Sequence, residues 1–379
     1  MKKMKKMRIF LGIFFVFSLM LLSSCSTEQS KQNSGNVKVY RIGSVVPLTG
    51  EGAVYGIPVQ RVEQKAVADL NEKWASKNMK LEVVYEDGKC NGRDALTASQ
   101  NLVNLQGVKI IIGGTCSSET LGMAPFTEEN KVLLFSTLSS SPDVSNAGDF
   151  VFRNYPSDVA QVEAMVSFIK SKGYKNIAIL SENTDYVQAL RKGYNDQLPK
   201  QGVKIVADEV VSPNAKDVKT ELSKIKSAKP DAVLLLPQTI PTGAVFAKQY
   251  FESGIKAQVL GNEVFGLPEL VRENSQIVEG AYSPSAVFDK EKDPEFLEFT
   301  KQTDCQLGFY CATTYDGVFI IGELIEKCGE NTECIKGQLY SLKDWQGKFS
   351  GSTTFDKNGD VKGQFQINQV VQGQIVKVS

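Results

Sequence analysis

The chain contains no histidine among its 379 residues. Without an imidazole there is no Ser-His-Asp or Cys-His catalytic arrangement and no histidine-ligated zinc. The Gly-x-Ser-x-Gly turn of many hydrolases, the Gly-x-x-x-x-Gly-Lys phosphate loop and Gly-x-Gly-x-x-Gly after a strand are also missing. These absences exclude most hydrolase mechanisms and the common nucleotide sites, so we expect no enzyme, no metal and no cofactor.

The chain also has no excess of one charge sign, because 43 Lys and Arg residues balance 43 Asp and Glu residues. A nucleic-acid-binding protein normally carries a basic stripe, and no long run of one sign follows residue 25. We therefore expect no nucleic-acid partner. The length and the hydrophobic fraction of 42% suit two domains, each with its own core.

The N-terminus has five basic residues within its first eight, then an apolar run at residues 9–22, then Ser23-Ser24-Cys25. This arrangement resembles a bacterial lipoprotein signal peptide, which is cut before the cysteine that carries the lipid. The resemblance implies that residues 1–24 are the leader, that Cys25 is lipidated and that residues 25–38 form a polar tether. A membrane-spanning helix is the alternative, but the run is shorter than the roughly 20 residues that a span needs. We expect an exported protein, anchored by lipid to the cell membrane and facing the periplasm or the cell exterior.

Seven cysteines are present, and setting Cys25 aside leaves six. Thiols outside the cytoplasm tend to pair, and six cysteines allow fifteen pairings. Short separations favour two pairs and thereby leave a third, which gives Cys305 with Cys311, Cys328 with Cys334, and Cys90 with Cys116. A metal site is the weaker alternative, because the chain has no Cys-x-x-Cys.

Strand and helix patterns alternate from residue 40 onward. We predict strands at residues 40–46, 81–85 and 108–112, and helices at residues 58–74 and 94–105. Pro58 suits the first turn of its helix. This βαβαβ order predicts an α/β fold in which helices cover both faces of a parallel sheet.

The third predicted strand ends in Gly113-Gly114, and a helix start follows at Ser117. The first N–H groups of a helix have no partner within it, and the helix dipole is positive at that end. This turn is therefore a candidate site for a carboxylate or a phosphate. The alternative is an ordinary strand-turn-helix unit without a ligand.

The next predicted strand, residues 131–135, runs into a hydroxyl-rich segment that contains Ser139, Ser140 and Ser141. Ligands of open α/β sheets bind beyond the carboxyl ends of the strands. We expect these serines and Ser117 to face one crevice. The alternative is a serine-rich surface loop.

A second βα series begins near residue 157. We predict strands at residues 176–180, 203–207, 231–236 and 258–260, and helices at residues 157–169, 218–225 and 242–251. Tyr186, Gln238 and Glu263 follow strand ends in this series. A lone glutamate is usually a solvated surface group, but at a strand end Glu263 is a candidate partner for a cation.

The chain beyond residue 280 carries three further helical patterns and a hairpin-like tail. The helices are predicted at residues 294–300, 312–325 and 333–342, and the tail strands at residues 352–355 and 365–378. The middle helix has a buried pattern and is expected to return to the first lobe. We predict lobe 1 at residues 39–155 plus 285–348, and lobe 2 at residues 156–284 plus 349–379.

Four motifs together resemble a known family. They are VPLTG at residues 46–50, GGTCSS at 113–118, YKNIAIL at 174–180 and FDKNGDVKG at 355–363. They are similar to the type I periplasmic binding proteins, specifically the Leu/Ile/Val-binding family of branched-chain amino acid ABC transporters. The resemblance covers nearly all of the chain after the tether. It implies two Rossmann-like lobes, three crossings between them and a ligand held in the cleft when the lobes close.

The resemblance also implies roles for single residues. Ser117, Ser139, Ser140 and Ser141 would bind the α-carboxylate end of an amino acid, and Glu263 would receive its α-ammonium. Tyr186 would close over the ligand and Tyr55 would line the side-chain pocket, while the Cys90–Cys116 pair is similar to one in the family. The family often has a tyrosine where this chain has Pro237-Gln238-Thr239, so Gln238 is the expected ligand contact there.

The expected function is that of a monomeric receptor that captures a branched-chain or other aliphatic amino acid and delivers it to an ABC permease. One alternative keeps the fold but binds an amide, a urea or an aromatic acid, or serves a sensor. An enzyme is a second alternative, although no Ser-x-x-Lys spacing begins at Ser117. A purely structural envelope protein is the third, and it would not need a polar crevice.

Overall fold

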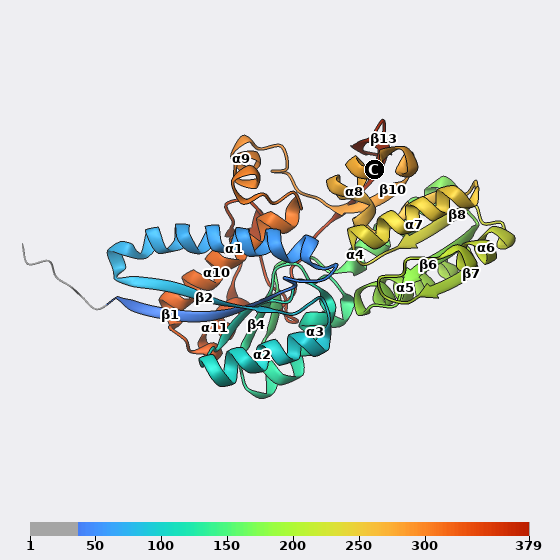
Figure 1. Cartoon of the computed structure of the whole chain (residues 1–379). Coiled ribbons are helices and arrows are strands. Elements are labelled where there is room, and N and C mark those ends of the chain that lie inside the picture. The colour runs from blue at the N-terminus through green and yellow to red at the C-terminus, as the bar shows by residue number, and fades with distance from the viewer. Residues whose placement is uncertain (1–36, 379) are drawn as a thin grey trace, which may run out of the picture. The chain divides into compact units, whose positions relative to one another are not determined.

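The computed structural model describes residues 37–378 (Figure 1). The predicted leader, Cys25 and the tether up to residue 36 lie outside the described residues. Residues from Val37 onward belong to one compact unit that contains two main β-sheets. The two sheets confirm the predicted two-lobe α/β architecture.

The first sheet is entirely parallel and has the strand order β2-β1-β3-β4-β5. Its strands are β1 (Lys38–Val46), β2 (Met79–Asp87), β3 (Ile110–Gly113), β4 (Leu133–Ser136) and β5 (Val151–Arg153). The helices between these strands are α1 (Ala53–Trp74), α2 (Gly92–Gln106) and α3 (Ser117–Glu129). Helices make the first three connections and a 3-10 turn makes the fourth. Because every pair of neighbouring strands is parallel, all five strands point their carboxyl ends to one edge.

The second sheet has the order β14-β13-β10-β9-β8-β6-β7 and is mixed. Its strands are β6 (Asn176–Glu182), β7 (Lys204–Val211), β8 (Ala232–Leu236), β9 (Gln258–Gly261), β10 (Tyr282–Ala286), β13 (Phe365–Val371) and β14 (Gln374–Lys377). Its helices are α4 (Asp158–Lys172), α5 (Asp185–Gln197), α6 (Lys219–Ala228), α7 (Ile240–Ser253) and α8 (Pro268–Val278). The tail supplies the antiparallel pair β13 and β14, which turn at Gln372-Gly373, where both residues have positive φ.

The remaining elements bring the chain back to the first sheet. They are α9 (Pro294–Thr303), α10 (Phe309–Cys328), α11 (Thr332–Ser341), β11 (Trp345–Gln346) and β12 (Ser352–Thr353). Helix α10 packs on α1, as its buried pattern predicted. Four short 3-10 turns complete the connections, at Ala75–Lys77, Pro142–Asn146, Pro199–Gln201 and Glu263–Gly266.

The lobe boundaries themselves stay a prediction, and one contact bears on the last of them. Phe355 packs edge-on against Phe135 and Phe152 of the first sheet. The N–H of Arg153 donates to the carbonyl of Gly359 at 3.0 Å. These contacts favour a third crossing after this segment rather than at residue 349.

Side-chain caps fix most helix starts. Asn91, Ser157, Thr184 and Thr239 each accept a hydrogen bond from a backbone N–H in the first turn of α2, α4, α5 and α7. Helices α6, α8 and α10 begin without such a bond. Helix α1 also lacks one, and here the predicted start is wrong. It begins at Ala53, so Pro58 lies inside it, because the turn after Gly52 already has helical backbone angles.

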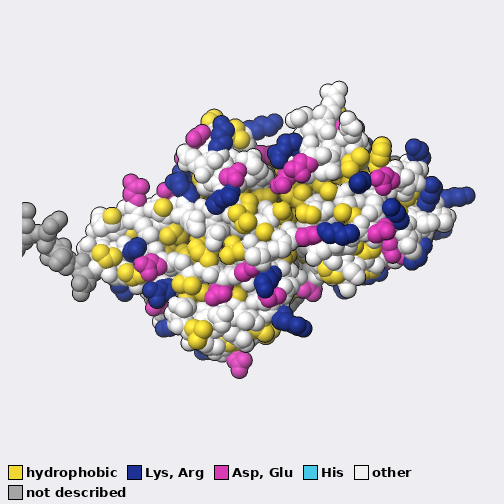
Figure 2. Space-filling model, in the orientation of Figure 1, with side chains coloured by type: hydrophobic (Ala, Val, Ile, Leu, Met, Phe, Trp, Pro, Cys, Tyr) yellow, Lys and Arg dark blue, Asp and Glu magenta, His cyan; other side chains and the backbone are white. Residues whose placement is uncertain are grey.

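The surface shows no patch of one charge sign on the face seen in Figure 2. Blue and magenta side chains alternate over both lobes, in line with the balanced composition. Among the helices of residues 37–378, none combines the length and the hydropathy needed to cross a bilayer.

Candidate functional site

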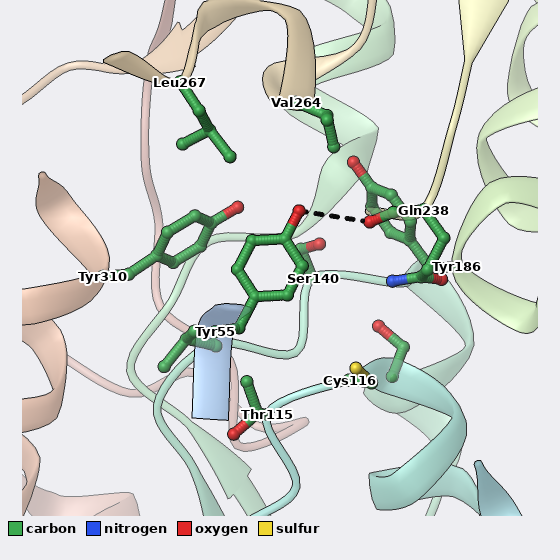
Figure 3. Close-up of a pocket in the computed structure, with 11 residues that line it drawn as sticks. Tyr55, Thr115, Cys116, Ser140, Tyr186, Gln238, Val264, Leu267 and Tyr310 are labelled. Carbon is green, nitrogen blue, oxygen red and sulfur yellow. Dashed lines mark hydrogen bonds between the residues drawn. The ribbon is translucent and has the colours of Figure 1, made fainter. Parts of the chain in front are cut away.

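A pocket lies where the carboxyl ends of strands from both sheets meet (Figure 3). It holds about 430 Å³ of unfilled space, part of it open to solvent. Its lining comes from both lobes: Tyr55, Thr115, Cys116, Ser117, Leu138, Ser140, Tyr186, Gln238, Val264, Leu267 and Tyr310. The structure therefore brings together five of the eight predicted ligand contacts, namely Tyr55, Ser117, Ser140, Tyr186 and Gln238.

The N-terminus of α3 forms one end of the pocket. Ser117 is the first residue of the helix, as predicted, and its side chain is buried at the pocket wall. Gly113 has a φ of 130°, and a Cβ there would lie 2.3 Å from the carbonyl oxygen of Val45. Only glycine fits this turn, which aims the helix N-terminus at the pocket. The arrangement supplies N–H donors and a positive dipole end for an anion.

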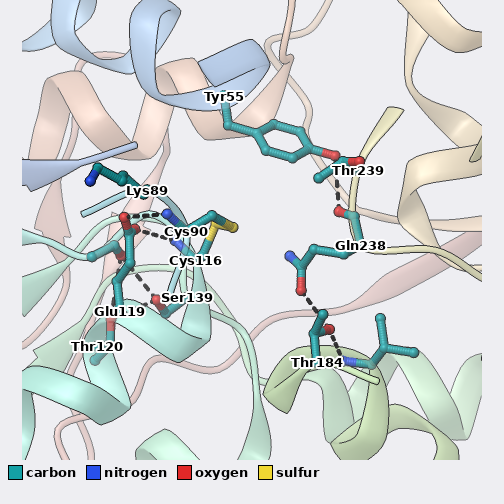
Figure 4. Close-up of a disulfide and its surroundings, with 12 residues drawn as sticks. Tyr55, Lys89, Cys90, Cys116, Glu119, Thr120, Ser139, Thr184, Gln238 and Thr239 are labelled. Atoms are coloured by element: carbon teal, nitrogen blue, oxygen red, sulfur yellow. Dashed lines mark hydrogen bonds between the residues drawn. A yellow bond between two sulfur atoms is a disulfide. The ribbon is translucent and has the colours of Figure 1, made fainter. Parts of the chain in front are cut away.

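A disulfide and a buried carboxylate brace this turn (Figure 4). All three predicted disulfides are present: Cys90–Cys116, Cys305–Cys311 and Cys328–Cys334. Glu119 accepts the N–H of Cys116 at 2.9 Å and the N–H of Cys90 at 3.0 Å. Burial raises the pKa of Glu119 to about 8, although these N–H bonds act to lower it. The carboxylate thus links the two cysteine backbones beside their S–S bond.

The predicted serine loop divides into one pocket residue and two internal ones. Ser140 lines the pocket, whereas Ser139 binds Thr120 at 2.7 Å and donates to the carbonyl of Gly114 at 2.9 Å. The hydroxyl of Ser141 accepts the N–H of Asp143 at 3.3 Å. Ser139 and Ser141 therefore hold the loop with their side chains and are not among the residues lining the pocket.

Arg153 holds the loop at Ser139–Ser141 in place through hydrogen bonds. Its guanidinium donates to the carbonyls of Ser139 and Ser141 at 3.2 and 2.7 Å, and to both carboxylate oxygens of Asp360 at 2.7 and 3.1 Å. The Arg153 side chain is fully buried, and that of Asp360 is 12% exposed. A bidentate pair of this kind holds one geometry, so Ser140 is presented by a rigid support.

Glu263 lies beside the pocket rather than in its lining. It follows β9 as predicted, and its two oxygens accept hydrogen bonds from Tyr155 at 2.6 Å and Tyr310 at 2.9 Å. Burial raises the pKa of Glu263 to about 7, against the lowering effect of the two phenols. Tyr310 borders both the pocket and the small cavity that contains Glu263. The Tyr310 phenol therefore lies between the Glu263 carboxylate and the pocket.

Asp158 is a second buried carboxyl group that was not predicted from the sequence, and its backbone N–H donates to the carbonyl of Ser140 at 2.8 Å. Its Oδ1 accepts from Gln161 at 2.6 Å, while its Oδ2 is buried without a partner among the described residues. Burial, and next the Glu263 carboxylate, raise the pKa of Asp158 well above its usual range. The buried carboxylates of Asp158 and Glu263 repel each other when both are charged, so a cation bound near them would be favourable.

The second lobe contributes an aromatic ring and an amide. Tyr186 is buried, and the amide of Asn262 donates to its hydroxyl at 3.4 Å. The Tyr55 hydroxyl donates to the carbonyl of Gln238 at 3.3 Å, a contact between the lobes (Figure 3). Oε1 of Gln238 accepts from Thr184 at 2.8 Å, and its amide nitrogen points toward the Cys90–Cys116 disulfide (Figure 4). This nitrogen is a free donor on the side facing α3.

The pocket wall between these polar ends is apolar and aromatic. Leu138, Val264 and Leu267 lie with the rings of Tyr55 and Tyr310 around the space (Figure 3). Within residues 37–378 no three histidine, cysteine, aspartate or glutamate side chains gather as a metal-binding set. The lining thus combines the N-terminus of α3 with an apolar and aromatic wall, and the Glu263 carboxylate is hydrogen-bonded to Tyr310 of that wall.

Sequence reasoning missed Tyr155, Asp158 and Tyr310. Tyr155 and Asp158 follow β5, so the strand-end rule could have found them had β5 been recognised; at three residues it is too short to give a pattern. Tyr310 lies in the first turn of α10, and no local signal marks it. Strand β10 and helix α8 were not predicted either, because the sequence around Pro284 and Pro268 suggests loops.

Comparisons with known proteins identify the family of the chain. Residues 39–374 match the family model for periplasmic binding protein. The leucine-, isoleucine-, valine-, threonine- and alanine-binding protein of Pseudomonas aeruginosa is 25% identical over 333 residues, which cover 85% of this chain and 87% of that protein.

Two solved structures share the fold. The branched-chain amino acid substrate-binding protein LivJ of Streptococcus pneumoniae, in complex with isoleucine, has a TM-score of 0.78 at 22% identity, over 90% of this chain and 99% of that chain. A solute-binding protein from Rhodopseudomonas palustris, in complex with 3,4-dihydroxybenzoic acid, has a TM-score of 0.78 at 19% identity, over 90% and 96%. Because the family model spans nearly all of the described residues, the chain belongs to the periplasmic binding protein family.

Proposed function

We propose that this protein binds a branched-chain or other aliphatic amino acid in the pocket between its lobes and delivers it to an ABC permease. The observation that carries the proposal is the pairing of opposite polar ends across one apolar wall. Helix α3 and Ser140 supply donors at one end, and Glu263, which accepts from the lining residue Tyr310, supplies a buried carboxylate at the other. An α-amino acid carries the matching carboxylate and ammonium.

The proposed roles follow from the contacts. Ser117 and the N–H groups of α3 bind the carboxylate, with Ser140 beside them. Glu263 receives the ammonium together with Asp158, once the hydrogen bond from Tyr310 rearranges toward the ligand. Tyr55 and Tyr186 close on the aliphatic side chain. Ser139 and Ser141 act indirectly: their N–H groups donate to Ser136 and Ser117, and their carbonyls accept from Arg153, so they hold the loop that presents Ser140.

The strength of such a site is sufficient for solute capture. Hydrogen bonds to charged groups contribute about 1.5 to 3 kcal/mol each, so three or four of them reach about 8 kcal/mol after ordering is subtracted. That free energy corresponds to about micromolar affinity. The buried apolar wall adds discrimination between side chains, at roughly 0.8 kcal/mol for each methylene group.

The cellular setting is part of the same proposal. The leader and Cys25 would place the protein outside the cytoplasm on a lipid anchor, as a monomer that works without a metal, a cofactor or a catalytic step. The lobes, at the predicted boundaries, would close on the ligand and present it to the permease. The relatives named above, which are described as binding proteins, support this role.

The test is a thermal-unfolding panel on protein that has been unfolded and refolded to remove bound ligand. The panel contains the amino acids, simple amides and urea, and benzoate-type carboxylates. A selective rise in melting temperature with Leu, Ile or Val, growing with concentration as linkage requires, supports the proposal. A rise only with compounds that lack an α-ammonium contradicts it.

An aromatic acid is the second candidate ligand, and the ring content of the site favours it. Tyr55, Tyr186 and Tyr310 line the pocket, and Tyr155 stacks on Tyr310 with ring centroids 4.7 Å apart. A structural relative at 19% identity is described in complex with 3,4-dihydroxybenzoic acid. Against this ligand stand Glu263 and Asp158, because an aromatic acid would leave both buried carboxylates without a cation.

A further inference from the structure

Two loops from different lobes meet outside the pocket. Residues 47–52 connect β1 to α1, and residues 212–218 connect β7 to α6. Between them the ammonium of Lys216 forms an ion pair with Oε1 of Glu51. The Glu51 side chain is 25% exposed, and its Oε2 is buried with no hydrogen-bond partner among the described residues. The carboxylate is therefore partly desolvated, and Lys216 is the cation that compensates it.

The second lobe holds Lys216 in place through its backbone. Gln249 of α7 accepts the N–H of Val218 at 2.7 Å and donates to the carbonyl of Lys216 at 2.8 Å. Because the backbone at Lys216 and at Val218 is already fixed, formation of the ion pair restricts little more than one flexible side chain. Such a pair loses less conformational entropy than one between two free loops.

Glu182, at the end of β6, links this loop to the pocket. Its carboxylate accepts the N–H of Asn214 at 2.5 Å and the N–H of Gln238 at 2.7 Å. Gln238 in turn accepts the hydroxyl of Tyr55 from the first lobe. One carboxylate thus positions two of the places at which the second lobe contacts the first lobe.

A groove lies between the two loops and is separated from the pocket by Gln238, which lines both. It holds about 1090 Å³ of unfilled space, including the part open to solvent. Glu51, Cys90, Asn214 and Gln238 line it, and Gln238 lines the pocket as well. A solute that enters or leaves along this groove passes the Glu51–Lys216 ion pair.

We propose that Glu51 and Lys216 form a clasp across the mouth of the cleft, which slows ligand exit, with Glu182 as the positioning residue behind it. The ion pair exists only when the two loops are close, so it stabilises the closed arrangement and not the open one. Partly exposed pairs of this kind change an equilibrium about two- to fivefold. The effect falls on the exit rate, because exit requires the clasp to open first.

The first experiment tests the contact without any ligand. The full-length protein is treated with a water-soluble carbodiimide, which joins carboxylates to amines that are already in contact. Peptide mass spectrometry should then find a Glu51–Lys216 cross-link that 1 M NaCl weakens. The Lys224–Glu209 pair, 2.8 Å apart within the second lobe, serves as the positive control. Cross-linking of the control without any Glu51–Lys216 product overturns the proposal.

The second experiment rests on the proposed function and uses L-leucine as the probe. Exit of radiolabelled leucine is followed by a chase with unlabelled leucine. Lys216→Met and Glu51→Gln should each speed exit two- to fivefold with little change in the association rate. Lys219→Met removes a neighbouring exposed charge that has no ion-pair partner among the described residues, and should leave exit unchanged.

The charge swap separates the clasp from a general structural effect. The double variant Glu51→Lys with Lys216→Glu should restore the slow exit that either single reversal loses. Failure of the swap to rescue, or equal effects of Lys216→Met and Lys219→Met, overturns the clasp. If leucine does not bind at all, the ligand assignment fails, and the cross-linking result alone then decides whether the clasp exists.

Discussion

The Tyr155 hydroxyl donates a hydrogen bond of 2.6 Å to Glu263, which links the end of the first sheet to the second lobe. Tyr310 donates to the other oxygen of the same carboxylate at 2.9 Å. The carboxylate is 6% exposed and has no cation among its partners. A buried acid held by two phenols is prepared for a positive ligand, because a hydrogen bond to an ammonium is stronger than one to a neutral donor.

Removing the negative charge of Glu263 tests whether this carboxylate binds a positively charged ligand. Glu263→Gln keeps the shape and an acceptor for one phenol but removes the negative charge. We expect affinity for the amino acid to fall about 10- to 100-fold by calorimetry, since a charged hydrogen bond contributes about 1.5 to 3 kcal/mol. Glu269→Gln, on the first turn of α8, is the matched control and should bind normally. Equal affinity of both variants would refute the role of Glu263.

The affinity for an amino acid should depend on pH around neutrality. Burial raises the pKa of Glu263 to about 7 in the ligand-free protein, and burial together with the Glu263 charge raises the pKa of Asp158. Below pH 7 binding of an ammonium must first remove a proton from Glu263, so affinity falls by up to about tenfold for each pH unit. Titration calorimetry at pH 5.5, 6.5 and 8 in buffers of different ionisation enthalpy should also detect proton release. A flat profile over this range would contradict the assignment.

The stability of the ligand-free protein should change with pH in the opposite direction. Burial raises the pKa values of Glu119 and Glu63 to about 8 and that of Glu263 to about 7, from about 4.5. The folded protein then binds more protons than the unfolded chain. The stabilisation is complete below about pH 4.5 and is lost as the pH rises through 7 and 8.

Urea unfolding of the ligand-free protein at pH 6 and pH 8.5 measures this effect. We expect higher stability at pH 6, by up to about 2 kcal/mol for each of these carboxyls. Glu119→Gln, which is neutral at every pH, should show a smaller difference between the two values. A stability that rises steadily from pH 6 to pH 8.5 would show that these carboxyls are ionised in the folded state.

Breaking the buried Arg153–Asp360 pair should destabilise the fold and the site together. Asp360→Asn leaves a fully buried guanidinium without its counter-charge, which costs about 3 to 5 kcal/mol of unfolding free energy. Ligand affinity should fall as well, because Arg153 also holds the carbonyls of Ser139 and Ser141. Asp196→Asn breaks an exposed pair with Lys192 and should cost less than about 1 kcal/mol. Similar losses for both variants would argue against the support role.

The three disulfides should contribute unequally. Cys90 and Cys116 are 26 residues apart, whereas the other two pairs are each 6 apart. On the chain-entropy model the long loop contributes about 3.5 kcal/mol and a short one about 2. Replacing Cys90 and Cys116 by serine should therefore lower the melting temperature more than replacing Cys328 and Cys334. The same variant should weaken binding, since Cys116 lines the pocket.

The strand-to-helix alternation, the anion turn at Ser117 and the three disulfide pairs could be derived from the sequence. Each depends on local features: apolar periodicity, a Gly-Gly turn before a helix start, and the short separations between cysteines in a chain expected to be exported. Pocket positions for Tyr186 and Gln238 followed from one topological rule, that parallel strands present their carboxyl ends at the same edge. The local sequence thus determined the framework and the edge at which the site forms.

The tertiary structure decided which side chains meet at that edge. Ser139, Ser140 and Ser141 are equivalent in sequence, but Arg153 and Thr120 orient the loop so that only Ser140 lines the pocket. Tyr310 reaches Glu263 from α10, 47 residues along the chain, because that helix returns to pack on α1. Side-chain direction in a loop and packing between distant helices depend on contacts that no local pattern contains. The sequence therefore determined the edge at which the pocket forms, and the three-dimensional packing decided which side chains line it.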